Sequence, residues 1–166
     1  MPLACLLGRG DQRLLDMGLR GAQIDPRHTV VLGPRSWEAE LLARMGVRVI
    51  CRNEIGARGL AACLAEVAAI MTAAPCGFGI TIDLDAFDPA AAPGVGSPEP
   101  GGLRARELRG GLQRLAAIPG LRALELAEYN PNRDRDGLTA KLISNLIEDM
   151  LPQLACASRI AGAQDI

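Results

Sequence analysis

Three acidic residues directly follow apolar runs that have the composition of buried β-strands. Asp83 and Asp85 follow the run 79–82, and Glu128 follows the run 124–127. Because alternate side chains of a strand point to the same face, this spacing places Asp83 and Asp85 on one face. Carboxylate oxygens are the ligands that Mn²⁺ and Mg²⁺ prefer, so the pair predicts half of a divalent-cation site. The alternative is that both acids only cap the next loop or solvate the edge of the sheet.

The connection that follows the aspartates, residues 86–102, is long and rich in turn-forming residues. It contains four prolines and four glycines within 17 residues. Loops of this length inside a compact domain usually carry function, so we expect this one to wrap the site. The alternative is an ordinary rigid surface loop built from tight turns.

Strand and helix patterns alternate along the whole chain. Apolar and β-branched runs predict strands at 29–33, 47–50, 79–84 and 121–127, and helical periodicity predicts helices at 36–45, 59–71, 103–117 and 139–151. Ser36 is the expected N-cap of the first of these helices. The alternation predicts an α/β fold in which helices cover both faces of a parallel sheet, with residues 1–166 forming a single domain.

The predicted fold determines where the acidic residues should meet. Ligands of parallel α/β sheets bind beyond the carboxyl ends of the strands, and Glu128 should emerge at the same edge as Asp83 and Asp85. An anionic pocket at that edge favours a cationic ligand. Nucleotide cradles are not indicated, because Gly94-x-Gly96 is followed by Glu99 where a dinucleotide fingerprint needs Gly or Ala, and no P-loop motif occurs.

Composition narrows the classes of partner. Eighteen basic and nineteen acidic residues give a net charge of −1, and aromatic residues make up 2% of the chain, so neither a phosphate-binding surface nor a base-stacking platform is expected. The five cysteines show no CxxC spacing, which favours a reducing cytoplasm and small buried thiols over zinc or disulfides. No apolar stretch is long enough to predict a membrane span.

Several segments resemble, in this order, the arginase family of ureohydrolases, which includes arginase, agmatinase and formimidoylglutamase. The matching segments are 81–103, Glu128-Tyr129-Asn130-Pro131 and 136–140. The most specific motif is SxDxDxxDP followed by PGxGxPxPGG, in which Thr81 takes the place of the usual serine. Residues 1–8 and 31–36 also resemble a helix and the following strand of that family, so the resemblance spans nearly the whole chain.

The resemblance implies a binuclear Mn²⁺ site whose bridging hydroxide attacks a guanidinium or formimino carbon. Carried over by position, Asp83 resembles the carboxylate that bridges both ions, and Asp85 the carboxylate that binds one of them. Glu128 resembles the residue that pairs with the cation of the substrate and positions it. The expected partner is therefore a small guanidino or formimino compound, and we also expect a homo-oligomer.

The chain resembles only the C-terminal portion of that family. The GGDHS and DAHxD elements that supply its histidine ligands are absent from these 166 residues, and the single histidine, His28, matches no motif. Because Mn²⁺ prefers about six ligands, we expect impaired activity. The family strand that bears DAHxD would lie between the strands at 29–33 and 79–84. We therefore expect two strand pairs around an open slot, with oligomerisation, poor solubility or direct pairing of these two strands as the consequence.

Three functional hypotheses remain open from the sequence. The first is an arginase-like ureohydrolase whose activity is impaired in this chain. The second is an inactive module of the same ancestry that acts only through self-association or complementation. The third is a Mg²⁺-dependent phosphohydrolase of the haloacid dehalogenase type, in which Asp83 would be the nucleophile. Ala86 and Phe87 disfavour the third, because that type usually has Gly or a hydroxyl residue after its two aspartates.

Overall fold

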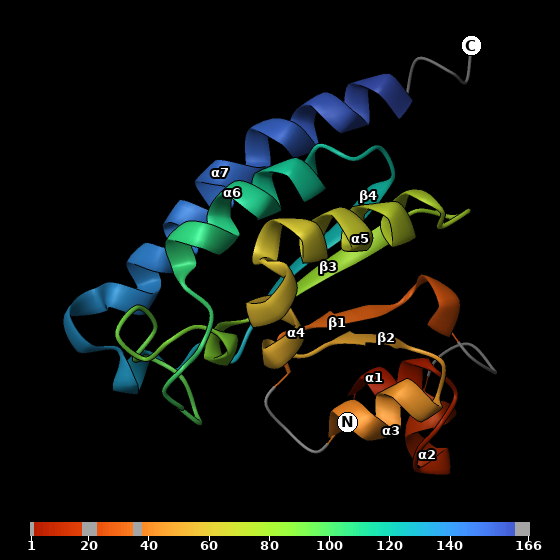
Figure 1. The fold of residues 1–166 in the computed structure, drawn as a ribbon, viewed down its shortest axis with the longest axis horizontal. Helices are drawn as coiled ribbons and strands as arrows, with labels where there is room; N and C mark the ends of the chain where they lie inside the picture. Colours follow the sequence, from red (N-terminus) through yellow and green to blue (C-terminus); the bar gives the residue numbers. More distant parts are fainter. Residues whose placement is uncertain (1, 18–22, 35–37, 162–166) are drawn as a thin grey trace.

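The computed structural model describes residues 2–17, 23–34 and 38–161, and it has an α/β architecture (Figure 1). The strands are β1 Val30–Leu32, β2 Arg48–Ile50, β3 Phe78–Asp83 and β4 Leu121–Ala127. The α-helices are α1 Pro2–Leu6, α2 Gln12–Leu15, α3 Glu38–Arg44, α4 Arg52–Arg58, α5 Leu60–Thr72, α6 Ala105–Ala116 and α7 Leu138–Ala161. Single 3₁₀ turns are η1 Pro26–His28, η2 Leu84–Ala86, η3 Pro131–Arg133 and η4 Arg135–Gly137.

The four strands form two separate parallel pairs. Strand β1 pairs with β2, in the register Val31 to Val49, and β3 pairs with β4, in the register Asp83 to Ala127. Figure 1 shows β1 and β3 as the inner strands of this arrangement, and none of the described residues forms a strand between them. The two expected pairs are confirmed, and the alternative in which the strands at 29–33 and 79–84 pair directly is wrong for this structure.

One hydrophobic core joins the two strand pairs on the side covered by α5, α6 and α7 (Figure 1). It includes Ile50 of β2 and Ile82 of β3, which are both buried, together with Cys63 of α5 and Leu112 of α6. A smaller cluster around Leu42 packs on the other face of β1 and β2. The opposite face of β3 and β4 differs from the expected two-sided cover, because its residues Gly79, Thr81, Asp83, Ala123 and Glu125 are exposed.

Local sequence signals explain where most helices and strands begin and end, and why one helix was not predicted. Strand β4 spans the predicted residues, whereas helix α4 was not predicted, since Cys51 precedes it without a capping side-chain hydrogen bond. Gly59 ends α4 with φ 82°, a left-handed conformation that favours glycine, and α5 begins at the next residue. Ser36, the predicted N-cap, lies outside the described residues.

The cysteines correct another prediction. Only Cys63 is buried among the four whose side chains the structure describes, whereas Cys51 and Cys76 are exposed and Cys5 is half-buried. Cys51 and Cys76 lie in short connections, next to β2 and before β3, where the chain runs along the surface. Among these four, the expectation of small buried thiols therefore holds for Cys63 alone, and the side chain of Cys156 lies outside the described part of the structure.

None of the individual helices in the described ranges is long and apolar enough to cross a membrane. Helices α4 and α5 meet the length and composition criterion only when they are taken together, and they are bent by 110° at Gly59.

Candidate functional site

The two aspartates lie at the carboxyl end of β3, but only one of them belongs to the strand. Asp83 is its last residue, and Asp85 lies in the 3₁₀ turn η2. The Asp83 carboxylate accepts a hydrogen bond of 3.2 Å from the Asp85 backbone N–H and so caps this turn. The expectation that both side chains share one face of a strand is therefore wrong, because the cap turns the chain after Asp83. The Asp83 side chain is exposed, and Asp85 is half-buried.

Glu128 emerges beside Asp83, as the parallel arrangement predicts. Asp83 is in register with Ala127, and Glu128 is the next residue along the chain. Glu128 has φ 67°, a left-handed conformation that non-glycine residues rarely adopt. Its carboxylate faces the loop, since a Cβ on Gly96 would be 3.6 Å from Glu128 Oε2. The structure thus brings an exposed carboxylate, a strained backbone and the long loop to one edge.

Hydrogen bonds hold the loop 86–102 at its ends and in its middle. The two ends are joined to each other, because Leu103 N–H donates to Ala86 O (2.7 Å) and the Asp88 carboxylate accepts from Gly101 N–H (3.0 Å). In the middle, Asn130 N–H donates to Gly94 O (2.8 Å), beside a bridge between Val95 and Tyr129. The loop is therefore fastened to the segment that carries Glu128, which agrees with the expectation that it wraps the edge.

The same loop is tied to the start of α7. The Thr139 hydroxyl is fully buried and accepts a hydrogen bond of 2.8 Å from Gly94 N–H. The Asp134 carboxylate accepts from Thr139 N–H (2.8 Å) and Ala140 N–H (2.9 Å), and the Tyr129 hydroxyl donates to it at 3.1 Å. Burial alone would raise the pKa of Asp134, but these hydrogen bonds outweigh it and keep the pKa below its usual value.

Gly94 and Gly102 are required by this packing. A Cβ on Gly94 would be 2.7 Å from Asp134 Cβ, and a Cβ on Gly102 would be 2.2 Å from the Phe87 carbonyl carbon. Both distances are shorter than side-chain carbons tolerate. The glycines of the motif therefore allow the loop to lie against β3 and the start of α7.

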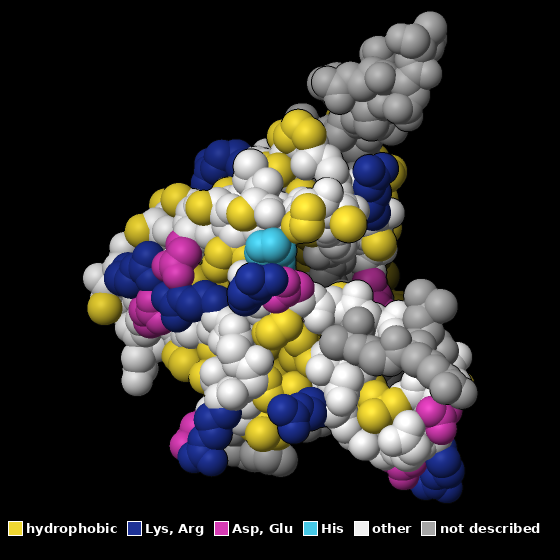
Figure 2. Space-filling view, turned by 90° about the vertical axis from the view of Figure 1, so that its right-hand side faces the viewer, with side chains coloured by type: hydrophobic (Ala, Val, Ile, Leu, Met, Phe, Trp, Pro, Cys, Tyr) yellow, Lys and Arg dark blue, Asp and Glu magenta, His cyan; other side chains and the backbone are white. Residues whose placement is uncertain are grey.

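His28 does not join the acidic edge. His28 ends the turn η1, just before β1. Gly33 lies just after β1 and close to Leu103, because a Cβ on Gly33 would be 3.3 Å from Leu103 Cδ1. Leu103 is hydrogen-bonded to Ala86, the last residue of η2, so the carboxyl ends of β1 and β3 share an edge, and His28 lies at the opposite one. Figure 2 shows the histidine at the surface beside basic and acidic side chains.

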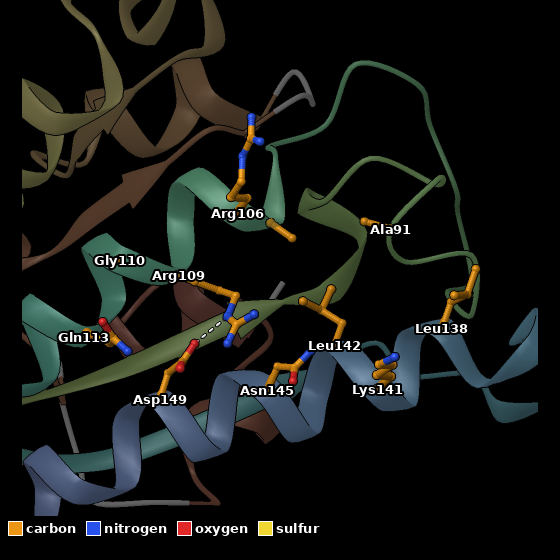
Figure 3. Close-up of a pocket in the computed structure, with 11 residues that line it drawn as sticks. Ala91, Arg106, Arg109, Gly110, Gln113, Leu138, Lys141, Leu142, Asn145 and Asp149 are labelled. Atoms are coloured by element: carbon orange, nitrogen blue, oxygen red, sulfur yellow. Dashed lines mark hydrogen bonds and ion pairs between the residues drawn. The ribbon is translucent and has the colours of Figure 1, made fainter.

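A cavity of about 430 Å³ lies elsewhere, between α6 and α7 (Figure 3). Figure 3 shows Arg109 of α6 pointing across to Asp149 of α7, with which it forms an ion pair, while Arg106 points away from α7. The hydrogen bond from Arg109 lowers the pKa of Asp149. Asp83, Asp85 and Glu128 are not among the lining residues, so this cavity belongs to the helix layer and not to the acidic edge.

Sequence reasoning missed the residues that hold the site together. Asp88, Arg133 and Thr139 fasten the loop through hydrogen bonds, including one of 2.7 Å from the Arg133 guanidinium to Gly96 O. Their partners are backbone groups 13 to 45 residues away in the chain. Asp88 lies in the SxDxDxxDP motif and Thr139 in the segment 136–140, and membership of these motifs was the only sequence signal that pointed to them.

The comparisons with known proteins agree on one family. The model of the arginase family matches residues 13–152. An arginase of Brevibacillus brevis is 36% identical over 158 residues, which cover 91% of this chain and 53% of that protein. An agmatinase of Chromobacterium violaceum is 31% identical over 128 residues, which cover 77% of this chain and 38% of that protein.

A solved structure gives the same result for the fold. The arginase of Bacillus caldovelox has a TM-score of 0.84 at 32% identity, over 90% of this chain and 51% of that one. The chain therefore spans about half the length of the relatives that it matches, and it keeps their arrangement over that half.

Proposed function

Because the chain belongs to the arginase family, we propose that it carries one part of a ureohydrolase active site at the carboxyl edge of β3 and β4. In this proposal Asp83 and Asp85 are metal ligands. Glu128 pairs with the cationic group of a small guanidino or formimino substrate. The relatives named arginase and agmatinase support a guanidino compound as the substrate class.

One observation carries the proposal: the register that sets Glu128 next to Asp83. Parallel pairing of Asp83 with Ala127 brings two carboxylates from distant parts of the chain to one edge. The left-handed backbone of Glu128 supports a functional role, since such strain persists mostly where a site requires it. A carboxylate presents two oxygens to the planar guanidinium fork, which makes the pairing strong and directional.

The metal part of the site is incomplete in this chain. The family resemblance implies Mn²⁺, which would supply a nucleophilic hydroxide near neutral pH when bound. Within the described ranges, no three His, Cys, Asp or Glu side chains lie close enough to hold one ion. Two aspartates do not fit a binuclear centre, because too few ligands offset the dehydration of the ions. We therefore propose that these 166 residues do not hydrolyse the substrate efficiently by themselves.

Two other functions were considered. The family match favours a ureohydrolase over a phosphohydrolase of the haloacid dehalogenase type. A chain that acts only by association with another polypeptide remains the second candidate, and the incomplete metal site supports it. The two candidates differ in whether activity appears when the part of a relative that lies outside the match is supplied.

Urea release tests the proposal. The purified chain would be incubated with Mn²⁺ and arginine or agmatine, with and without the part of the Brevibacillus brevis arginase that lies outside the match. We expect less than about one turnover per second from the chain alone and urea release when both polypeptides are present. Turnover at enzyme-like rates by the chain alone would contradict the incomplete site. A formed complex without urea release would contradict the hydrolase.

A further inference from the structure

We propose that Arg133 makes the edge that carries Glu128 selective for guanidino acids, which are guanidino compounds with a carboxylate at the other end of the molecule. Glu128 pairs with the guanidinium of such a substrate, and Arg133 pairs with its carboxylate. The inference rests on the proposed function, because it adds a second contact to the same substrate. Its evidence is the position of both side chains around one loop residue, Gly96.

Gly96 lies next to both of these oppositely charged side chains. The Arg133 guanidinium donates a hydrogen bond of 2.7 Å from Nη1 to Gly96 O. On the same residue, a Cβ would be 3.6 Å from Glu128 Oε2. Because the atoms of one residue lie within about 3 Å of each other, Arg133 Nη1 and Glu128 Oε2 are at most about 10 Å apart. One small molecule can therefore reach both groups.

The two charged groups do not neutralise each other directly. Neither Glu128 nor Arg133 forms an ion pair with a described residue, so their charged atoms are more than 4.0 Å apart. Both side chains are exposed. A guanidinium has five N–H donors, and Gly96 O accepts from only one nitrogen of Arg133. Arg133 therefore keeps donors for a ligand, and a carboxylate matches the planar fork of a guanidinium.

The length of an arginine molecule fits the spacing of the two groups. Its guanidinium and carboxylate carbon atoms are about 7 Å apart when the molecule is extended. The structure places Glu128 and Arg133 more than 4.0 Å and at most about 10 Å apart. Agmatine is arginine without the carboxylate, so it can pair with Glu128 but offers no anion to Arg133. The positive charge of Arg133 therefore predicts a preference for the acid over the amine.

The turn that carries Arg133, η3, is fixed on both sides. Before it, Asn130 N–H donates to Gly94 O (2.8 Å), and the Asn130 side chain accepts from Asn132 N–H (3.1 Å). After it, the Asp134 carboxylate accepts from two backbone N–H groups at the start of α7, at 2.8 and 2.9 Å. Arg133 is the last residue of η3, between these anchors. Its guanidinium is therefore presented by a preorganised turn, which lowers the entropy cost of binding.

A purely structural role for Arg133 predicts a different behaviour of the two substrates. The hydrogen bond to Gly96 O fastens the loop, and the loss of this bond alone would lower the use of arginine and agmatine alike. The loss of a contact with the carboxylate would lower the use of arginine only. The ratio of the two kcat/KM values therefore separates substrate selection from loop packing.

Kinetics test this selectivity in the Mn²⁺-loaded complex of the chain with the part of the Brevibacillus brevis arginase outside the match. Arg133→Gln removes the charge, so kcat/KM for arginine should fall about three- to tenfold, as for a solvent-exposed charged contact. The value for agmatine should change by about twofold at most. Arg133→Lys keeps the charge and should restore most of the preference. Arg135→Gln removes the same charge from the next turn, η4, and should leave the ratio unchanged.

A binding measurement on the chain alone separates this inference from the proposed hydrolase. Arginine and agmatine are each titrated into the isotope-labelled chain, and NMR follows the backbone amide of Glu128 and the side-chain Nε–H of Arg133. We expect both ligands to shift the Glu128 signal and only arginine to shift the Arg133 signal. Agmatine should bind about three- to tenfold more weakly than arginine. If the complex releases no urea, this titration decides alone.

Three results would overturn the selectivity and leave the proposed hydrolase intact. These are an unchanged ratio of kcat/KM values in Arg133→Gln, an equal loss of preference in Arg133→Lys, and equal affinity of the chain for arginine and agmatine. Arginine that shifts neither the Glu128 nor the Arg133 signal would contradict both proposals. An arginine-specific shift at Arg133 without urea release would support the second contact and contradict only the hydrolase.

Discussion

At the scale of residues, Glu128 is the side chain most clearly prepared for a ligand. A non-glycine residue in the left-handed region costs about 1–3 kcal/mol, which the surrounding structure must offset. Here the hydrogen bond from Asn130 to Gly94 and the bridge between Val95 and Tyr129 hold the segment in place. The carboxylate is exposed and faces Gly96, so it is open to a ligand from outside.

Glu128→Gln should weaken substrate use and leave the metal content unchanged. The amide keeps the shape of the side chain but loses the charge that pairs with a guanidinium, so we expect kcat/KM to fall roughly ten- to a hundredfold. The measurement is urea release by the two-polypeptide complex, together with its metal content. Glu125→Gln is the control and should change kcat/KM little, because Glu125 lies within β4, three residues before Glu128, and accepts a hydrogen bond from Thr81. Loss of metal in Glu128→Gln would make Glu128 a metal ligand and contradict its assigned role.

At the scale of elements, the start of α7 acts as an anchor for the long loop. Thr139 connects the two through its buried hydroxyl, which accepts from Gly94 N–H, while its own N–H donates to Asp134. Helix α7 also packs against α6 through the ion pair between Arg109 and Asp149. The position of the loop beside Glu128 therefore depends on how α7 packs in the helix layer.

Thr139→Val should destabilise the fold by about 1–3 kcal/mol, because it leaves the buried Gly94 N–H without an acceptor. Chemical denaturation followed by circular dichroism measures the free energy of unfolding. Thr139→Ser keeps the hydroxyl and serves as the matched control, with a smaller loss from the missing methyl group. Equal losses in the two variants would show that the hydrogen bond contributes nothing and that only packing matters.

At the scale of the whole molecule, the chain consists of two strand pairs on one core. The pairs keep the arrangement seen in the Bacillus caldovelox arginase, to which the chain has a TM-score of 0.84. Within the described residues, no strand pairs with the inner edge of β1 or of β3, and one face of β3 and β4 is exposed. Free strand edges are templates for pairing with other chains, so this architecture favours association.

The isolated chain should self-associate or precipitate as its concentration rises, and the complementary arginase segment should suppress this. The reason is that edge-to-edge pairing of two copies gives hydrogen-bond partners to the inner edge of β1 or of β3, whereas a strand inserted between them gives partners to both. Analytical ultracentrifugation over a range of concentrations, with and without the segment, measures the effect. A chain that stays monomeric and unfolds cooperatively at every concentration would show that the free edges are well solvated and carry no such cost.

Local sequence patterns predicted all four described strands and the helices α3, α5, α6 and α7. Strand and helix periodicity is a local property, so β4 and the positions of Asp83 and Glu128 could be predicted, together with their meeting at one edge. The motifs around the loop also identified the family before any comparison.

The way in which these parts are held together could not be predicted from local patterns. The tertiary structure moved Asp85 off the strand, because the Asp83 side chain caps the turn that follows, and it assigned Thr139 to the loop across 45 residues. The structure also contains helix α4, which has no N-cap side-chain hydrogen bond that the sequence could indicate, and one face of β3 and β4 is exposed. The hydrogen bond of Thr139 and the exposed face depend on contacts between distant segments, and such contacts leave no periodic signal in the sequence.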